Sequence, residues 1–211
     1  MSEAERHVEV HEEKLVFNGF FKISQAVLSY SRVNGQGKME NVTRLVFERG
    51  DSVAVLVHDV ERNVIILAEQ FRYPTLKKTG GWIVELPAGS LPAEESPRAC
   101  LVRELREELG YAVGEDDLEF VANVFMSPGG TSERIYIYYV QVKPAHKVDP
   151  DASGVAEEQE DVRAVELPLR TFLDQCQEGV LTDAKTVLAG LWLAVQGEKA
   201  KKPKPRSRKK G

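Results

Sequence analysis

The first third of the chain shows the short alternation of apolar and polar residues that is typical of β-strands. Strand-like segments lie at residues 15–17, 20–23, 26–30 and 44–47. Asn34-Gly35 falls between two of them and predicts a hairpin turn. A sheet of this size is marginal by itself. We therefore expect residues 14–49 to form a small antiparallel β subdomain after a flexible N-terminus, residues 1–13.

The middle and end of the chain alternate between apolar strand patterns and helical patterns. Strands are predicted at residues 52–58, 63–72, 82–89, 118–125, 134–142 and 161–167, and helices at residues 168–178 and 183–195. The segment 77–81, which ends in two glycines, is expected to be a flexible loop. Mixed strands and helices of this kind predict one α/β domain over residues 50–196.

One further helix has clear boundaries. Ser96 followed by Pro97 is a helix start, because the serine side chain caps the first turn and proline suits its fixed φ. Gly110 suits the left-handed position that ends helices. Between them, apolar residues recur at three- and four-residue steps and form one stripe. These residues are Leu101, Val102, Leu105 and Leu109.

A second face of this helix carries three acids. Glu104 and Glu108 lie one turn apart, with Glu107 beside them. Like charges at this spacing repel and weaken a helix. Mg²⁺ or Mn²⁺ would relieve the repulsion, because both ions prefer carboxylate oxygen. The alternative is a solvated helix in which Arg103 and Arg106 neutralise the acids.

The spacing of residues 89–111 decides between these interpretations. The stretch resembles the Nudix box, G-x5-E-x7-R-E-U-x-E-E-x-G-U with U aliphatic, and every fixed position is matched. Those positions are Gly89, Glu95, Arg103, Glu104, Glu107, Glu108 and Gly110. Tyr111 stands where an aliphatic residue is usual, which affects packing and not chemistry. The resemblance identifies the chain as a Nudix hydrolase.

The resemblance implies both the fold and the metal ligands. The expected fold is a Nudix α/β/α sandwich with a mixed sheet, preceded by the N-terminal β subdomain. Glu104 and Glu108 are expected to be the principal ligands of Mg²⁺ or Mn²⁺, joined by the backbone carbonyl of Ala88. Glu107 is expected to be a ligand or the partner of one.

The remaining fixed positions of the box are expected to be structural. A pair between Glu95 and Arg103 would hold the loop against the helix. Gly89 would allow the tight turn into the box, and Gly110 would end the helix.

Residues 127–133, Ser-Pro-Gly-Gly-Thr-Ser-Glu, narrow the resemblance. The ADP-ribose and nucleoside-diphosphate-sugar pyrophosphatases carry a proline, a glycine and a nearby glutamate shortly after the box, and Pro128 lies seventeen residues after Tyr111. The resemblance implies that Glu133, on a mobile loop, is the general base, with Glu107 as the alternative. It also implies a homodimer that exchanges the N-terminal subdomain. Candidate substrate-binding residues are Arg72, Glu85, Pro128 and Gly129, although Arg72 is equally well read as a surface arginine.

Composition limits the partners. The formal net charge is −5, yet residues 197–211 contain eight Lys/Arg and one Glu, so a disordered basic tail is expected to follow an acidic body. No apolar run approaches the roughly 20 residues of a membrane span. Cys100 and Cys176 are too few for a disulfide framework. We expect a cytoplasmic protein that binds neither membrane nor nucleic acid.

These observations together predict metal-dependent hydrolysis of the diphosphate bond in ADP-ribose or a related nucleoside diphosphate sugar. GDP-mannose or another nucleotide sugar is the alternative substrate. A module that senses ADP-ribose without cleaving it is a different class of function, and the complete carboxylate set argues against it. A third interpretation makes the basic tail an anchor for an RNA 5′ end.

Overall fold

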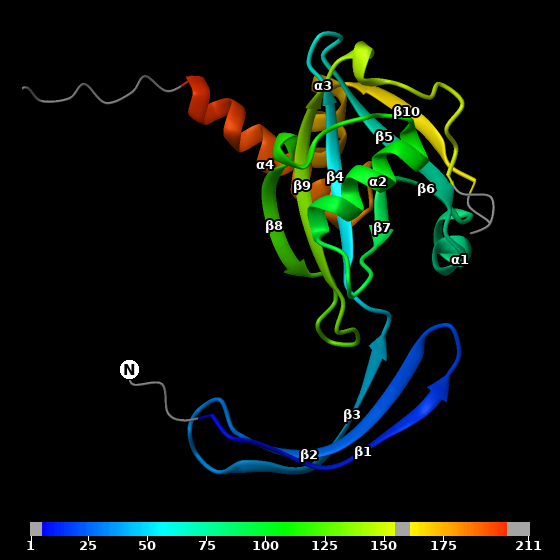
Figure 1. The fold of residues 1–211 in the computed structure, drawn as a ribbon. Coiled ribbons are helices and arrows are strands. Elements are labelled where there is room, and N and C mark those ends of the chain that lie inside the picture. The colour runs from blue at the N-terminus through cyan, green and yellow to red at the C-terminus, as the bar shows by residue number, and fades with distance from the viewer. Residues whose placement is uncertain (1–5, 155–160, 202–211) are drawn as a thin grey trace, which may run out of the picture. The chain divides into compact units, whose positions relative to one another are not determined.

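The computed structural model describes residues 6–154 and 161–201, with the backbone alone for residues 198–201. The chain divides into two compact units (Figure 1). The first contains residues 1–51 and 125–134, and the second contains residues 52–124 and 135–211. None of the described helices combines the length and the apolar character that a membrane span requires.

The first unit is built on a three-stranded antiparallel sheet. Its strands are β1 (Val8–Asn18), β2 (Lys22–Ser31) and β3 (Lys38–Glu48), in the order β1-β2-β3. The predicted turn at Asn34-Gly35 joins β2 to β3, and Gly35 has a φ of 72°. Residues 8–13 were expected in a flexible terminus, and this was wrong. They begin β1, because their backbone pairs with β2 from Val8 opposite Tyr30 onward.

The second unit contains the mixed sheet that the sequence predicts. Its strands are β4 (Ser52–Asp59), β5 (Val64–Phe71), β6 (Trp82–Glu85), β7 (Ala88–Ser90), β8 (Glu119–Phe125), β9 (Arg134–Val142) and β10 (Arg163–Pro168). The main order is β10-β5-β4-β9-β8, with β6 beside β5 and β7 beside β4. Strand β4 is parallel to β9 and antiparallel to β5.

Helices cover both faces of this sheet, as the expected α/β/α sandwich requires. Helix α2 (Pro97–Leu109) lies on one side of the strands, and α3 (Leu169–Glu178) and α4 (Ala184–Lys201) lie on the other (Figure 1). The core under α2 joins its stripe Leu101, Leu105 and Leu109 to alternate residues of β4 and β9. On the other face, the Tyr139 ring of β9 packs against Trp192 of α4 in a tilted arrangement, with ring centroids 5.5 Å apart.

Two boundaries differ from the predictions. Residues 77–79, expected in a flexible loop, belong to the short helix α1 (Leu76–Thr79), which Gly80 ends with a φ of 83°. Helix α4 continues to Lys201, so residues 197–201 are helical and do not belong to a disordered tail. The rest of the predicted basic tail, residues 202–211, and the first five residues lie outside the described part of the chain. Short 3₁₀ turns at Tyr73–Thr75, Glu115–Asp117 and Pro144–His146 complete the elements.

Candidate active site

Helix α2 forms for the reasons that the sequence suggests. The Ser96 hydroxyl accepts a hydrogen bond from the Ala99 amide at 3.1 Å, and Pro97 occupies the first turn. Gly110 ends the helix with a φ of 69°. A Cβ atom at Gly110 would lie 1.7 Å from the carbonyl oxygen of Asp149, so the close approach of that segment also requires glycine. Both ends of α2 are therefore fixed by local chemistry.

Two of the box glutamates are buried. Glu104 is 8% exposed and Glu108 is 1% exposed, and they lie one turn apart on the same side of α2. This side faces β7: a Cβ atom at Gly89 would lie 2.1 Å from Oε1 of Glu104. Gly89 thus does more than allow a turn, because any side chain there would displace the Glu104 carboxylate. The buried acid and the Ala88–Gly89 backbone are brought together.

Arg103 is the centre of the ion pairs on α2. Its guanidinium lies 3.3 Å from Glu95, 3.0 Å from Glu104 and 2.8 Å from Glu107. The expected pair with Glu95 is present. The pairs with Glu104 and Glu107 are those of the alternative interpretation, in which Arg103 neutralises acids of the helix. Burial opposes the charge of Arg103, but the three carboxylates outweigh that effect and raise the pKa of the guanidinium above its usual value.

The carboxylates around Arg103 also affect the pKa of the Cys100 thiol. Its Sγ lies 3.4 Å from the backbone oxygen of Ser90 in β7. Burial, followed by the negative charges of Glu104 and Glu95, raises the pKa of the thiol to about 12. The thiol is therefore protonated near neutral pH and is unsuited to nucleophilic chemistry.

The oxygen donors on α2 and β7 suit a hard divalent cation. Carboxylate and backbone carbonyl oxygens are the ligands that Mg²⁺ and Mn²⁺ prefer. Across residues 6–154 and 161–201, however, no three His, Cys, Asp or Glu side chains are grouped closely enough to hold an ion by themselves. A cation at Glu104 and Glu108 would therefore need further oxygen ligands from the backbone, water or a substrate.

The candidate substrate-binding residues Arg72 and Glu85 lie together in the second unit. Arg72 donates from Nε to Oε1 of Glu85 at 2.7 Å. The other carboxylate oxygen of Glu85 accepts from Lys185, and Glu85 is 3% exposed. Both oxygens of Glu85 are thus engaged, so the carboxylate orients two cations. The Arg72 side chain is 41% exposed, and its bond to Glu85 uses Nε and not the terminal nitrogens.

The other predicted residues belong to the first unit. Pro128 and Gly129 are exposed in the loop between β8 and β9. Glu133 is 7% exposed, and its carboxylate lies 3.5 Å from Arg49. The guanidinium of Arg49 also lies over the Phe21 ring.

The loop that carries Glu133 is tied to the end of β3. The Phe47 amide donates to the Gly130 oxygen at 2.8 Å, Ser132 donates to Glu48, and Arg134 pairs with Asp51 at 2.8 Å. Independent closure of this loop would require these bonds to break.

Sequence reasoning missed the residues at the start of α4. Lys185 and Thr186 contact the segment Glu85–Leu86, which is 100 residues away along the chain. Asp183 accepts hydrogen bonds from both of them. Asp183 ahead of an apolar helix is a recognisable cap signal. No local signal predicts the pairing of Lys185 with Glu85.

Comparison with known proteins places this site in a family. The NUDIX domain model matches residues 48–187. A GDP-mannose pyrophosphatase from Pectobacterium atrosepticum is 32% identical over 183 residues, which cover 86% of this chain and 91% of that protein. A GDP-mannose pyrophosphatase from Cronobacter sakazakii is 31% identical over 193 residues, which cover 90% and 97%.

A solved structure agrees with the fold. The crystal structure of an ADP compounds hydrolase superposes with a TM-score of 0.66 and covers 92% of this chain and 96% of its own. The two sequences are 20% identical, so this likeness supports the architecture alone.

Proposed function

The chain belongs to the NUDIX family, and we propose that it hydrolyses the diphosphate bond of a nucleoside diphosphate sugar. The products would be a nucleoside monophosphate and a sugar phosphate. The observation that carries this proposal is the pair of buried carboxylates, Glu104 and Glu108, one turn apart on α2 and beside the Ala88–Gly89 backbone. Burying two acids together is costly unless a cation or a proton offsets their charge.

A divalent cation, Mg²⁺ or Mn²⁺, is the expected cofactor. Glu104, Glu108 and the backbone carbonyl of Ala88 would hold it, with Glu107 as a further ligand or as the partner of one. When bound, such an ion neutralises phosphate charge and lowers the pKa of a coordinated water. Arg103, already paired with three carboxylates, would keep their side chains oriented. Arg72 would present its terminal nitrogens to a phosphate oxygen.

The general base is proposed to be Glu133, with Glu107 as its rival. Glu133 is buried, and its carboxylate lies 3.5 Å from the guanidinium of Arg49. Glu107 is held by Arg103 at 2.8 Å and belongs to the box itself. Substitution separates them, because only the base should change turnover without changing cation binding.

GDP-mannose is the first substrate to test, and ADP-ribose is the second. Both curated relatives described above are GDP-mannose pyrophosphatases, and each is matched over most of its own length. ADP-ribose remains in the panel because the resemblance of the Pro128 loop implies it. The chemistry at the diphosphate is the same for both substrates.

The test is a panel of nucleotide sugars and dinucleotides assayed with purified full-length protein and Mg²⁺, with products identified by chromatography. We expect GDP-mannose to give GMP and mannose 1-phosphate, and EDTA to stop the reaction. The variant Glu108→Gln should be inactive under the same conditions. Binding of ADP-ribose without cleavage of any compound would instead support a sensing module. Cleavage restricted to capped or triphosphorylated RNA would support the RNA interpretation.

We also propose that two copies of the chain associate through the first unit. Every residue of β1 is exposed, and several large apolar side chains of this sheet face outward. They include Val8, Val10, Leu15, Phe17 and Leu45, and Phe20 in the turn between β1 and β2 is exposed as well. A three-stranded sheet with such a surface requires a partner, and a second copy is the partner expected from the resemblance. A monomer in light scattering at micromolar concentration would contradict this proposal.

We propose a cytoplasmic location because neither cysteine forms a disulfide. Cys100 and Cys176 are both free thiols and both buried. Reduced thiols are the rule in the cytosol.

A further inference from the structure

Leu86 and Pro87 join β6 to β7, and hydrogen bonds hold this short segment from two sides. On one side, the Val55 amide of β4 donates to the Pro87 oxygen at 3.1 Å. On the other side, the amide of the fully buried Leu86 donates to the Thr186 hydroxyl at 2.9 Å. Thr186 lies in the first turn of α4, so this helix start contacts the backbone that leads into the box.

The Thr186 hydroxyl is the donor in one hydrogen bond and the acceptor in another. It has one hydrogen, which it donates to Oδ2 of Asp183 at 2.5 Å. It therefore accepts from Leu86. The same Asp183 oxygen accepts from the Thr186 amide at 3.0 Å, so Asp183 caps α4. The cap, the hydroxyl and the Leu86 amide form one directed chain of hydrogen bonds.

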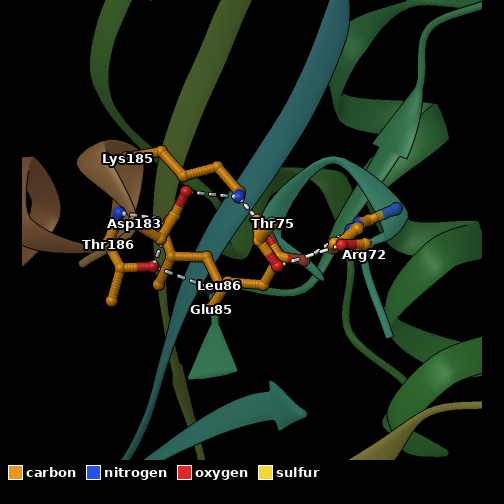
Figure 2. A network of polar contacts seen from close by, with 7 residues as sticks. All are labelled: Arg72, Thr75, Glu85, Leu86, Asp183, Lys185 and Thr186. Carbon is orange, nitrogen blue, oxygen red and sulfur yellow. Dashed lines mark hydrogen bonds and ion pairs between the residues drawn. The ribbon is translucent and has the colours of Figure 1, made fainter. Parts of the chain in front are cut away.

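A second chain starts from the same cap. Oδ1 of Asp183 lies 3.0 Å from Lys185, and Lys185 also bonds Glu85, whose other oxygen binds Arg72 at 2.7 Å. Figure 2 shows these side chains converging between α4 and β6. The Lys185 side chain is only 8% exposed. Two cations face two acids, so the chain is balanced in charge.

Helix α4 is seated firmly enough to act as a support. A Cβ atom at Gly190 would lie 2.5 Å from Sγ of Cys176 on α3, so the two helices approach closely at that glycine. The Trp192 ring packs against the Tyr139 ring of the sheet. Displacing the first turn of α4 would therefore disturb packing along the helix.

We infer that the first turn of α4, through Asp183, Lys185 and Thr186, is a positioning element for the active site. It sets the Ala88 carbonyl through Leu86 and sets the Arg72 guanidinium through Glu85. The inference rests on the proposed function, in which Ala88 is a metal ligand and Arg72 meets a phosphate. Residues that orient ligands from outside the coordination sphere typically change metal affinity or activity by roughly 10–100-fold when they are lost.

The test compares Thr186→Val with Thr186→Ser and with Thr171→Val, the same substitution at an exposed position of α3. Valine keeps the shape of threonine and removes the hydroxyl, whereas serine keeps the hydroxyl. In Thr186→Val we expect Mn²⁺ affinity, measured by electron paramagnetic resonance without substrate, to fall roughly 10–100-fold. We also expect the Leu86 amide to exchange faster with solvent. Thr186→Ser and Thr171→Val should match the wild type in both measurements.

The Mn²⁺ and exchange measurements do not depend on turnover, so they test this inference even if no nucleotide sugar is cleaved. Wild-type Mn²⁺ affinity in a folded Thr186→Val would overturn it. Equal losses in Thr186→Val and Thr186→Ser would also overturn it, because the hydroxyl would then be irrelevant. If Thr186→Val does not fold, Thr186→Ala decides the matter, because alanine also lacks the hydroxyl and is smaller than valine. Wild-type Mn²⁺ affinity in that variant would likewise overturn the inference.

Discussion

Two ion-pair networks in the second unit differ in charge balance. Around Glu85, the cations Arg72 and Lys185 face the acids Glu85 and Asp183. On α2, the guanidinium of Arg103 forms ion pairs with Glu95, Glu104 and Glu107. The buried Glu108 lies one turn from Glu104. The first network resembles an ordinary structural cluster, because its charges cancel. The second has acids in excess, as a site for divalent cations requires.

The largest expected effect comes from the network with excess acid. Replacing Glu104 or Glu108 by glutamine removes a metal ligand and keeps the shape of the side chain, so hydrolysis of GDP-mannose should fall below detection. Thermal unfolding without metal should occur at the same temperature or higher, because a repelling charge is lost. Glu94→Gln, at an exposed position of the box loop, should behave as the wild type. Near-normal turnover in either ligand variant at saturating Mg²⁺ would refute the assignment.

The next effect concerns the base. Glu133→Gln should lower kcat by about 10²–10⁴-fold with KM little changed, because a general base acts in the transition state. Its Mn²⁺ affinity should hold, since the α2 carboxylates are untouched. Glu107→Gln is the comparison. If Glu133→Gln keeps half of the wild-type kcat while Glu107→Gln loses several orders of magnitude without losing metal, the base lies in the box.

The sequence predicted best where local chemistry decides. Ser96, Pro97 and Gly110 specify both ends of α2, and the apolar pattern of residues 134–142 gives β9 at its observed bounds. The family and the α/β/α fold follow instead from the resemblance of residues 89–111 to the Nudix box, and both are confirmed.

Elements that depend on distant partners were missed. Residues 8–13 are rich in acids and histidine, and they are strand only because β2 pairs with them. Lys185 and Glu85 meet through packing of α4 against the sheet, which no periodicity encodes.

Substitution in the charge-balanced network around Glu85 should destabilise the fold, whereas Glu104→Gln is expected to leave its stability unchanged or higher. Glu85→Ala leaves Lys185 and Arg72 without their shared acid, and we expect the free energy of unfolding to fall by about 3 kcal/mol. That value is at the low end for a buried pair, because Asp183 still contacts Lys185. Glu69→Ala removes a more exposed pair with Arg163 and should cost less than about 1 kcal/mol. Similar destabilisation by Glu85→Ala and Glu104→Gln, measured by urea unfolding, would erase the distinction between the networks.

The smallest expected effect is on thermal stability with added cation. A ligand that binds only the folded state at 100 times its Kd adds about 2.7 kcal/mol, so Mg²⁺ should raise the unfolding temperature of the wild type by several degrees. Glu108→Gln should show no such shift. Glu94→Gln should keep it. A shift of equal size in all three proteins would mean that Mg²⁺ binds elsewhere.

The central claim is that the excess acid on α2 binds divalent cation. Its most direct test is titration of the wild type, Glu94→Gln and the double variant Glu104→Gln/Glu108→Gln with Mn²⁺, with free ion followed by electron paramagnetic resonance. We predict saturable binding to the first two proteins and none to the double variant. Unchanged Mn²⁺ binding by the folded double variant would contradict the account.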